Sequence, residues 1–370
     1  MLPLISLFGL FAFVQLFYLL IFSITISKKR PANSHALPPV SILVCAHDEE
    51  ENLKKLIPDL LNQDYPDFEV IVVNDRSNDN TYDYLRELSQ QDDRLKMVNV
   101  KDTPSHVNGK KYAITLGIRA AANDWIVLTD ADCRPVSNLW VRSMADSFTD
   151  DAQFVLGFAP YQTSPGFLNH FIRFETVITA LQFLSLALMK NPYMGVGRNL
   201  AYRKSLFLAK KGFNNFLHVI GGDDDLFVNQ HATGRNTRVH IAADAITTSV
   251  PEKTWTDFFY QKVRHLSVGK YYKSGHKVIV GLFKISWVLT LFVGFTVLSL
   301  SWNNYVIAGA IAGVLLCRWI LLGVAVNSLI RKAGLRFNFA LIPVLDIVYP
   351  IYYISTGLVA FFTKKVRWKT

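Results

Sequence analysis

Apolar residues gather at the two ends of this chain, and a more polar stretch of ordinary globular composition lies between them. Residues 2–26 carry no charged side chain, and this run is long enough for a helix to cross a hydrocarbon core of ~30 Å. Further apolar runs follow near the C-terminus, at residues 278–302, 305–330 and 340–362. We therefore expect an N-terminal anchor, a folded polar domain and a C-terminal membrane region, over residues 1–30, 31–277 and 278–370.

The first apolar run is compatible with a retained anchor or with a cleaved signal peptide. No basic stretch precedes it, no small-residue cleavage site follows it, and the charges come after it, at Lys28, Lys29 and Arg30. These features favour a retained anchor. Because lysine and arginine gather on the cytoplasmic side of membrane proteins, this cluster predicts a multi-pass protein of the cell (inner) membrane with a cytoplasmic polar domain.

The runs at 278–302 and 305–330 are separated by a short link and predict a helical hairpin. Lys284 and Arg318 lie inside them, where a charge is costly in lipid, so we expect each to reach the interface or to face a partner. A full crossing by the last run, 340–362, would put the basic tail after it outside the cell. The sequence therefore leaves open whether this run crosses the membrane, turns back or lies in the interface.

The formal net charge of the chain is +10. Many of the basic residues flank the apolar runs, which suits anionic lipid headgroups, so we expect contact with a lipid bilayer and no nucleic acid partner. Cys45, Cys133 and Cys317 show neither a pairing pattern nor metal-ligand spacing. Unpaired cysteines fit a reducing compartment.

Within the polar domain, apolar strand patterns alternate with helical patterns. Residues 39–47 (PVSILVCAH) and 68–74 (FEVIVVN) are almost continuous apolar runs rich in β-branched residues, which is typical of strands buried on both faces of a parallel sheet. A weaker strand is expected at 95–98 and another at 125–129. The alternation predicts an α/β fold with a doubly wound, mainly parallel sheet.

Polar residues follow these strands. Ligands of doubly wound sheets bind at the carboxyl ends of the strands, where His47, Asp75 and Asp130 fall. Asp130 and Asp132 place two carboxylates on one side of an extended segment, and such oxygens suit Mg²⁺ or Mn²⁺, which stabilises a diphosphate leaving group. An isolated Asp-x-Asp is more often a surface turn, but its place after a buried strand favours the metal site.

Asp75 and Lys110 each have a structural and a functional interpretation. Asp75 is suited to accept hydrogen bonds from a nucleotide base or ribose, which is the favoured interpretation, and a simple turn or a helix N-cap is the alternative. Lys110 precedes a helical pattern, where it either meets a diphosphate or is simply solvated.

A second acidic cluster comprises Asp223, Asp224 and Asp225. Successive carboxylates repel one another and need a cation, a helix-start dipole or a raised pKa. One of them is a candidate general base for an acceptor hydroxyl, and a solvated capping cluster is the alternative. Downstream, Gln261 and Arg264 offer an amide and a fixed cation near a diphosphate, unless they lie on an exposed helix face.

Taken together, residues 39–272 resemble an inverting family-2 glycosyltransferase with the GT-A fold. The segments that carry the resemblance are VSILVCAHDEEENL, VIVVNDRSNDNT, NGKKYAITLGIRAA, LTDADCRP, GVGRNLAYRKSLF and GGDDDLF. The resemblance implies that Asp132 binds the metal with help from Asp130, and that Asp223 or Asp224 is the catalytic base. It also implies a nucleotide-sugar donor, most commonly a UDP-sugar, bound by His47, Glu49, Asp75, Lys110, Asp130, Arg198, Asn199, Gln261 and Arg264.

Two departures from the family pattern bear on the activity. Gly222 stands where relatives often carry glutamate, and this alignment favours Asp223 as the base with Asp224 close behind. Processive synthases carry Gln-x-x-Arg-Trp, whereas here His265 follows Gln261 and Arg264. The missing tryptophan favours addition of one sugar over polymerisation.

An apolar helical pattern at residues 166–189 lies between the two acidic motifs. It predicts either an ordinary core helix or a helix at the bilayer surface that guides a lipid acceptor to the site. We therefore expect transfer of a single sugar to a membrane lipid or lipid-linked acceptor. The alternatives are a processive polysaccharide synthase and a non-catalytic membrane scaffold with a degenerate transferase domain.

Overall fold

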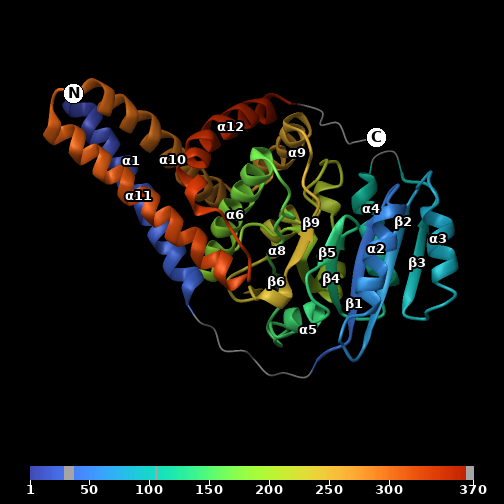
Figure 1. Cartoon of the computed structure of the whole chain (residues 1–370). Helices are drawn as coiled ribbons and strands as arrows, with labels where there is room; N and C mark the ends of the chain where they lie inside the picture. Colours follow the sequence, from blue (N-terminus) through green and yellow to red (C-terminus); the bar gives the residue numbers. More distant parts are fainter. Residues whose placement is uncertain (29–36, 105–106, 364–370) are drawn as a thin grey trace.

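The computed structural model describes residues 1–28, 37–104 and 107–363 of the chain (Figure 1). These residues form a central sheet of seven strands in the order β3-β2-β1-β4-β7-β6-β8, beside a separate two-stranded sheet of β5 and β9. Some of the basic residues predicted to flank the membrane, namely Lys29, Arg30 and those from 364 onward, lie outside the described part.

One half of the central sheet is parallel. Strand β1 pairs in parallel with β2 and β4, and β2 pairs in parallel with β3. The strands are β1 (Val40–Ala46), β2 (Phe68–Asp75), β3 (Leu95–Val100) and β4 (Trp125–Asp130), and the helices are α2 (Glu50–Leu61), α3 (Thr81–Leu88) and α4 (Gly109–Ala120). This arrangement confirms the predicted α/β fold with a doubly wound, mainly parallel sheet.

The other half of the sheet is mixed, because β7 runs antiparallel to both β4 and β6. Its strands are shorter than those of the parallel half. The strands of this half are β6 (Phe154–Leu156), β7 (Leu200–Arg203) and β8 (Thr237–Val239). The small second sheet is formed by β5 (Cys133–Pro135) and β9 (Thr247–Ser249), and the accompanying helices are α5 (Trp140–Ala145), α7 (Lys204–Ala209), α8 (Asp225–His231) and α9 (Trp255–Val268).

Alternate residues of β1 belong to two hydrophobic cores, one on each face of the sheet. Ile42 and Val44 pack with residues of α2, α3 and α5, whereas Leu43 packs with residues of α4 and α6. Because helices cover both faces, neither set of side chains meets water. This explains why the strand is apolar along its whole length.

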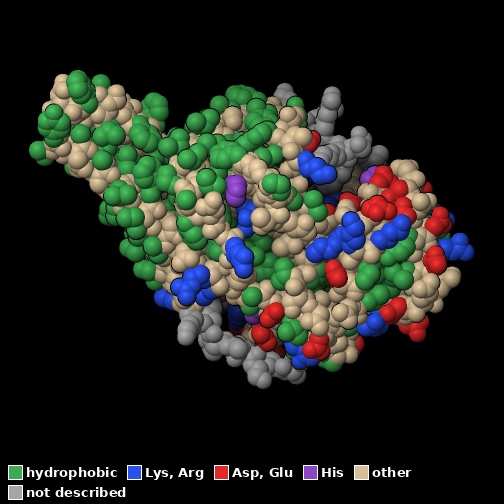
Figure 2. Space-filling model, in the orientation of Figure 1, with side chains coloured by type: hydrophobic (Ala, Val, Ile, Leu, Met, Phe, Trp, Pro, Cys, Tyr) green, Lys and Arg blue, Asp and Glu red, His purple; other side chains and the backbone are tan. Residues whose placement is uncertain are grey.

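The apolar ends of the chain come together in space. Helices α1 (Leu2–Ser27), α10 (Ser274–Leu300) and α11 (Tyr305–Lys332) pack into a bundle that projects from the sheet, and α10 and α11 form the expected hairpin (Figure 1). Helix α12 (Ile342–Phe362) is continuous through Pro350, diverges from this bundle and packs along α9. Apolar side chains cover the bundle, while charged side chains gather over the sheet (Figure 2).

Helix α6 (Phe167–Leu188) joins the sheet to the bundle. It packs against α1, α11, α12 and β8, and most of its residues are buried. Of the two interpretations open at the sequence level, the structure supports the core helix. Among the described residues, five helices are long and apolar enough to cross a membrane: α1, α6, α10, α11 and α12 with the turn before it.

Both charged residues inside the predicted hairpin face polar partners. Arg318 is fully buried and donates to both carboxylate oxygens of Asp346 in α12, with one nitrogen–oxygen distance of 2.9 Å. Trp319 donates to the same carboxylate at 2.8 Å. Lys284 donates to the hydroxyl of Tyr349. The ion pair with Asp346 neutralises the buried charge of Arg318, whereas the partner of Lys284 is a neutral hydroxyl.

Candidate active site

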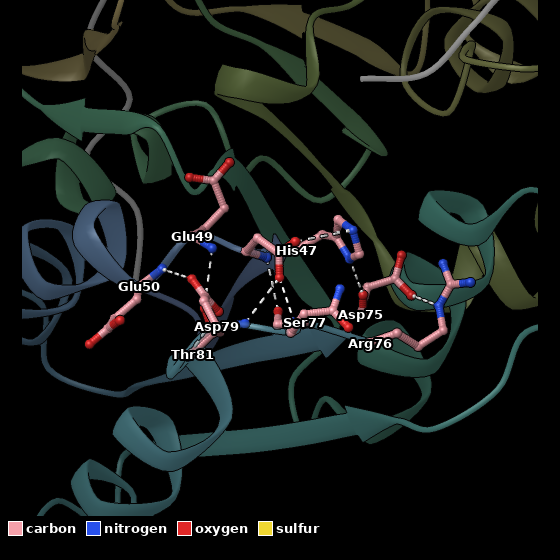
Figure 3. A network of polar contacts seen from close by, with 10 residues as sticks. His47, Glu49, Glu50, Asp75, Arg76, Ser77, Asp79 and Thr81 are labelled. Carbon is pink, nitrogen blue, oxygen red and sulfur yellow. Dashed lines mark hydrogen bonds and ion pairs between the residues drawn. The ribbon is translucent and has the colours of Figure 1, made fainter. Parts of the chain in front are cut away.

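Two turns at the carboxyl edge of the sheet, after β1 and β2, are tied together by hydrogen bonds (Figure 3). The amide of Glu49 donates to Thr81 Oγ1 at 3.1 Å, and His47 Nδ1 lies 2.5 Å from the carbonyl oxygen of Asp75. The carboxylate of Glu49 extends away from this network (Figure 3). The network fixes both turns, so His47 and Asp75 lie at one edge as the sequence predicts, with Glu49 beside them.

Asp75 is engaged by its own neighbour in the chain. Its Oδ1 accepts from Arg76 Nε at 2.8 Å, and the residue is only 8% exposed. Arg76 adopts a left-handed backbone conformation with φ of 58°, which is uncommon for a long side chain. Such local backbone strain is often found at functional sites, where a turn holds a side chain in one orientation.

The Asp-x-Asp motif ends β4 beside the last residues of β1, where Asp130 pairs in register with Cys45. Burial raises the pKa of Asp132, and the charge of Asp130 adds to the effect. Burial also raises the pKa of Glu49, with Asp132 and Asp130 as further causes. Three acidic side chains from the β1 and β4 ends therefore repel one another across a common space.

Lys110, at the start of α4, connects the two acidic motifs. Its Nζ lies 3.0 Å from Asp130 Oδ1 and 3.5 Å from Asp223 Oδ2. Burial disfavours the charge of Asp130, but Lys110 outweighs it and holds the pKa of that carboxyl below its ordinary value. A single ammonium thus brings together carboxylates that are far apart in the sequence.

The buried thiol of Cys45, near the end of β1, is influenced by the same charges. Burial raises the pKa of its thiol; Lys110 lowers it, and Asp130, Asp223 and Asp75 each raise it further. Because electrostatic effects fall off with distance, all four charged groups lie around the end of β1.

The second acidic motif begins with two glycines in the left-handed region, Gly221 at φ of 78° and Gly222 at φ of 74°. A Cβ on Gly222 would come within 2.7 Å of the Leu226 side chain. Both facts require glycine here. They explain why this chain departs from the family pattern at Gly222, since a glutamate would be strained at this turn.

The carboxylates of this motif have different partners. Asp224 caps α8 and accepts from the amides of Gly197 and Asp225, each at 2.7 Å. Burial and the charge of Asp223 raise the pKa of Asp224 to about 6. Asp225 accepts from the Tyr272 hydroxyl at 2.6 Å, and burial raises its pKa well above the ordinary value.

Lys111 is a residue that the sequence reasoning missed. It is fully buried, and its Nζ donates to the carbonyl oxygens of Val219 and Gly221. Burial lowers the pKa of Lys111 to about 8. The lysine holds the turn that precedes the acidic motif against α4, so it positions Asp223 rather than contacting a ligand.

The remaining predicted residues separate into two groups. Arg198 stacks on the ring of Tyr161 at 4.3 Å, and the Tyr161 hydroxyl donates to Gln261 Oε1 at 3.2 Å. Asn199, for which the resemblance implied donor contact, is instead fully buried. Its side chain bonds to Trp140, Phe158 and Ala245. Asn199 therefore supports the site from within the core and does not line it.

A cavity of about 800 Å³ lies between the acidic motifs and the apolar helices α6, α10 and α12. His47, Glu49 and Asp75 lie at the same sheet edge outside its lining. His265, which stands where processive synthases carry tryptophan, also lines the cavity. The predicted site residues that line it are Lys110, Asp130, Asp132, Arg198, Asp223, Asp224, Gln261 and Arg264.

Several known proteins are similar to this chain in sequence. The probable glycosyltransferase YdaM of Bacillus subtilis (strain 168) is 29% identical over 243 residues, which is 63% of this chain and 55% of that protein. The beta-monoglucosyldiacylglycerol synthase of Trichormus variabilis is 34% identical over 28% of this chain and 22% of that protein. The poly-beta-1,6-N-acetyl-D-glucosamine synthase of Staphylococcus aureus (strain COL) is 27% identical over 29% of this chain and 25% of that protein. The chain thus spans about half or less of the length of these relatives.

Almost the whole chain can be superposed on a solved structure. The mannosyltransferase PcManGT from Pyrobaculum calidifontis, in complex with GDP-Man and Mn²⁺, has a TM-score of 0.59 and 15% identity, with 98% of this chain and 99% of that chain covered. At this identity the likeness concerns the fold. Two family models match the sequence, glycosyl transferase family 2 over residues 41–208 and glycosyl transferase family group 2 over residues 125–362. The second covers more than half of the chain, so the protein belongs to the family-2 glycosyltransferases.

Proposed function

We propose that this glycosyltransferase moves a single sugar from a nucleotide-sugar donor, a UDP-sugar by family frequency, to a membrane lipid or lipid-linked acceptor with inversion. One observation carries the proposal. The same cavity that is lined by Asp130, Asp132 and Asp223 extends to residues of α6, α10 and α12. A water-soluble donor and a lipid acceptor can therefore meet in one space.

The donor end of the cavity is suited to a diphosphate. Lys110, Arg198 and Arg264 line it and supply donors for phosphate oxygens. The turns after β1 and β2 supply His47, Glu49 and Asp75 beside it, where a base and ribose would contact them. Gln261, a residue of α9, also lines the cavity.

The residues at this edge fit a divalent cation. Asp132 and Glu49 both have pKa values raised by burial and by neighbouring carboxylates, and a cation would relieve this repulsion. Among the described residues, no three His, Cys, Asp or Glu side chains form a ready-made metal site. Mg²⁺ or Mn²⁺ would then be held by Asp132 and Asp130 with phosphate oxygens and water, as is usual for Mg²⁺. When bound, the ion neutralises the departing diphosphate.

Asp223 is the residue that we assign as general base. Both oxygens of Asp224 already accept backbone amides, whereas Asp223 lines the cavity beside Lys110. Asp223 takes the proton of an acceptor hydroxyl, and that oxygen bonds to the anomeric carbon. The bond from this carbon to the diphosphate oxygen breaks, and its electron pair leaves with the nucleotide, assisted by Lys110.

The orientation of the membrane helices supports a cytoplasmic site in the cell membrane. The C-terminal ends of α1 and α11 meet on the side of the sheet, where Lys332 Nζ donates to the carbonyl oxygen of Lys28 at 2.7 Å. Arg331 lies beside them. Basic residues gathered at these helix ends fit the cytoplasmic face, where nucleotide sugars are made available.

The alternative is a polysaccharide synthase, which one group of relatives represents. To decide between the two, membranes containing the protein would be incubated with a panel of labelled nucleotide sugars and a lipid extract, with and without chelator. We expect the label to be extracted with the lipids into the organic phase, and we expect turnover to be lost when chelator is added. Label in a polymer precipitate would support the alternative. Turnover that stays the same when chelator is added would exclude a role for the metal.

A further inference from the structure

The membrane end of the cavity has a defined lining. From α10 it receives Lys277, Val280, Gly281 and Lys284, which share one helical face by their spacing. From α12 it receives Tyr353 and Gly357. A Cβ on Gly281 or on Gly357 would meet nothing within 4 Å, so both glycines border open space at the cavity.

Lys284 is buried in this lining without a counter-charge. The residue is 6% exposed, its Nζ donates to the Tyr349 hydroxyl, and it lies 4.9 Å and 5.1 Å from the rings of Tyr349 and Tyr353. Among the described residues, no carboxylate forms an ion pair with it at 4.0 Å or less. Burying an ammonium with only neutral partners is energetically costly, and an anion bound beside it would reduce that cost.

The nearest acidic side chain is engaged elsewhere. Glu175 of α6 pairs with Lys262 of α9 at 2.5 Å and accepts from Thr179 at 3.0 Å. Glu175, Lys262 and Lys284 all line the cavity, and the one carboxylate among them is paired with Lys262. The membrane end of the cavity therefore carries net positive charge.

A second polar group points to the same kind of ligand. Gln182 of α6 also lines the cavity, is 2% exposed, and its Nε2 has no hydrogen-bond partner among the described residues. An unsatisfied buried donor is costly. Gln182 is a donor without an acceptor, and Lys284 is a cation whose hydrogen-bond partner is a neutral hydroxyl, so the missing partner is rich in acceptor oxygens and negatively charged.

We propose, on the basis of the lipid acceptor proposed above, that this acceptor is a phosphate-bearing lipid whose anionic group is bound by Lys284 and Gln182. The acceptor hydroxyl then reaches Asp223 at the other end of the cavity. The hydrocarbon chains leave between α10 and α12, past Gly281 and Gly357. A neutral lipid or a neutral polysaccharide would leave the Lys284 ammonium without a counter-charge.

The test uses the full-length protein in membranes and a lipid extract separated on an anion-exchange column into acidic and neutral fractions. We expect the wild-type protein to label lipid in the acidic fraction. Label in the neutral fraction alone would overturn this inference and leave the lipid-acceptor function intact. Label in a polymer with neither fraction labelled would overturn both, so the two failures are distinguishable.

Variants then test the role of the ammonium. We expect K284M to raise KM for the acidic fraction by about tenfold or more, as loss of a charge-assisted hydrogen bond implies, with a smaller fall in kcat. K284R should restore most of the affinity, and Cys317→Ser, on the exposed surface of α11, should behave as wild type. Tyr349→Phe removes the hydroxyl but keeps the charge. An unchanged KM in K284M, or an equal loss in Tyr349→Phe, would contradict the proposal.

Discussion

The effect of replacing Asp224 on the stability of the protein should change sign with pH. Burial and the neighbouring Asp223 raise the pKa of Asp224 from 3.8 to about 6 in the folded protein. A carboxyl with a raised folded pKa destabilises the native state when it is ionised. The penalty is absent at low pH, develops as the pH rises from about 4 to about 6, and persists above that range.

Asp224→Asn removes this penalty and one hydrogen bond. A shift from 3.8 to about 6 corresponds to about 3 kcal/mol. The amide retains only one oxygen for the two backbone amides that Asp224 now caps, which costs about 1 kcal/mol. The variant should therefore be more stable than wild type by about 2 kcal/mol at about pH 8, and less stable by about 1 kcal/mol at about pH 4.

The assay is thermal unfolding of the purified protein in detergent across this pH range. For a domain of this size, about 1 kcal/mol shifts the midpoint by roughly 2 °C to 4 °C, so the two proteins should differ measurably and in opposite directions at the two ends. Asp93→Asn, at an exposed aspartate on the surface, serves as the matched control and should follow wild type. Parallel profiles for wild type and Asp224→Asn would refute the reasoning.

Three further substitutions test separate parts of the structure. Lys110→Met removes the cation beside Asp223 and should lower donor kcat/KM by about 100-fold or more, measured with labelled donor; a loss under about threefold would contradict its role. Arg318→Met leaves Asp346 buried without its partner and should destabilise by roughly 3 to 5 kcal/mol, measured as a lower unfolding midpoint. Asn199→Ala leaves three buried polar partners unpaired and should destabilise by roughly 3 kcal/mol; an unchanged midpoint would contradict a supporting role.

The parallel half of the sheet could be predicted from the sequence because its signals are local. Continuous β-branched runs mark β1 and β2, and strand direction alone places His47, Asp75 and Asp130 at one edge. A helix start at the second acidic motif could also be predicted from the sequence, because acidic residues favour a helix N-terminus, and α8 begins there.

Side-chain direction and distant partners could not be predicted in the same way. Lys110 and Lys111 are adjacent in the sequence, yet successive helical residues point about 100° apart, so one meets Asp130 and the other meets Gly221. The resemblance placed Asn199 in the donor site because of its motif, and only packing shows that it faces the core.

The placement of α6 and of the charged residues in the bundle also depended on tertiary structure. The sequence pattern of an apolar helix is the same whether the helix contacts lipid or protein. The contacts of α6 with both the sheet and the bundle show that it is a core helix. The sequence indicated that Arg318 needs a partner, but its choice of Asp346 follows from the way α11 and α12 pack.

The central claim is that acidic side chains from β4 and the start of α8, joined by Lys110, form one metal-assisted donor site. It is tested most directly by turnover of labelled nucleotide sugar in membranes that contain wild type, Asp132→Asn or the surface variant Asp93→Asn. We expect Asp132→Asn to lose about 100-fold or more in kcat and Asp93→Asn to match wild type. Near wild-type turnover by Asp132→Asn, unaffected by chelator, would contradict the claim.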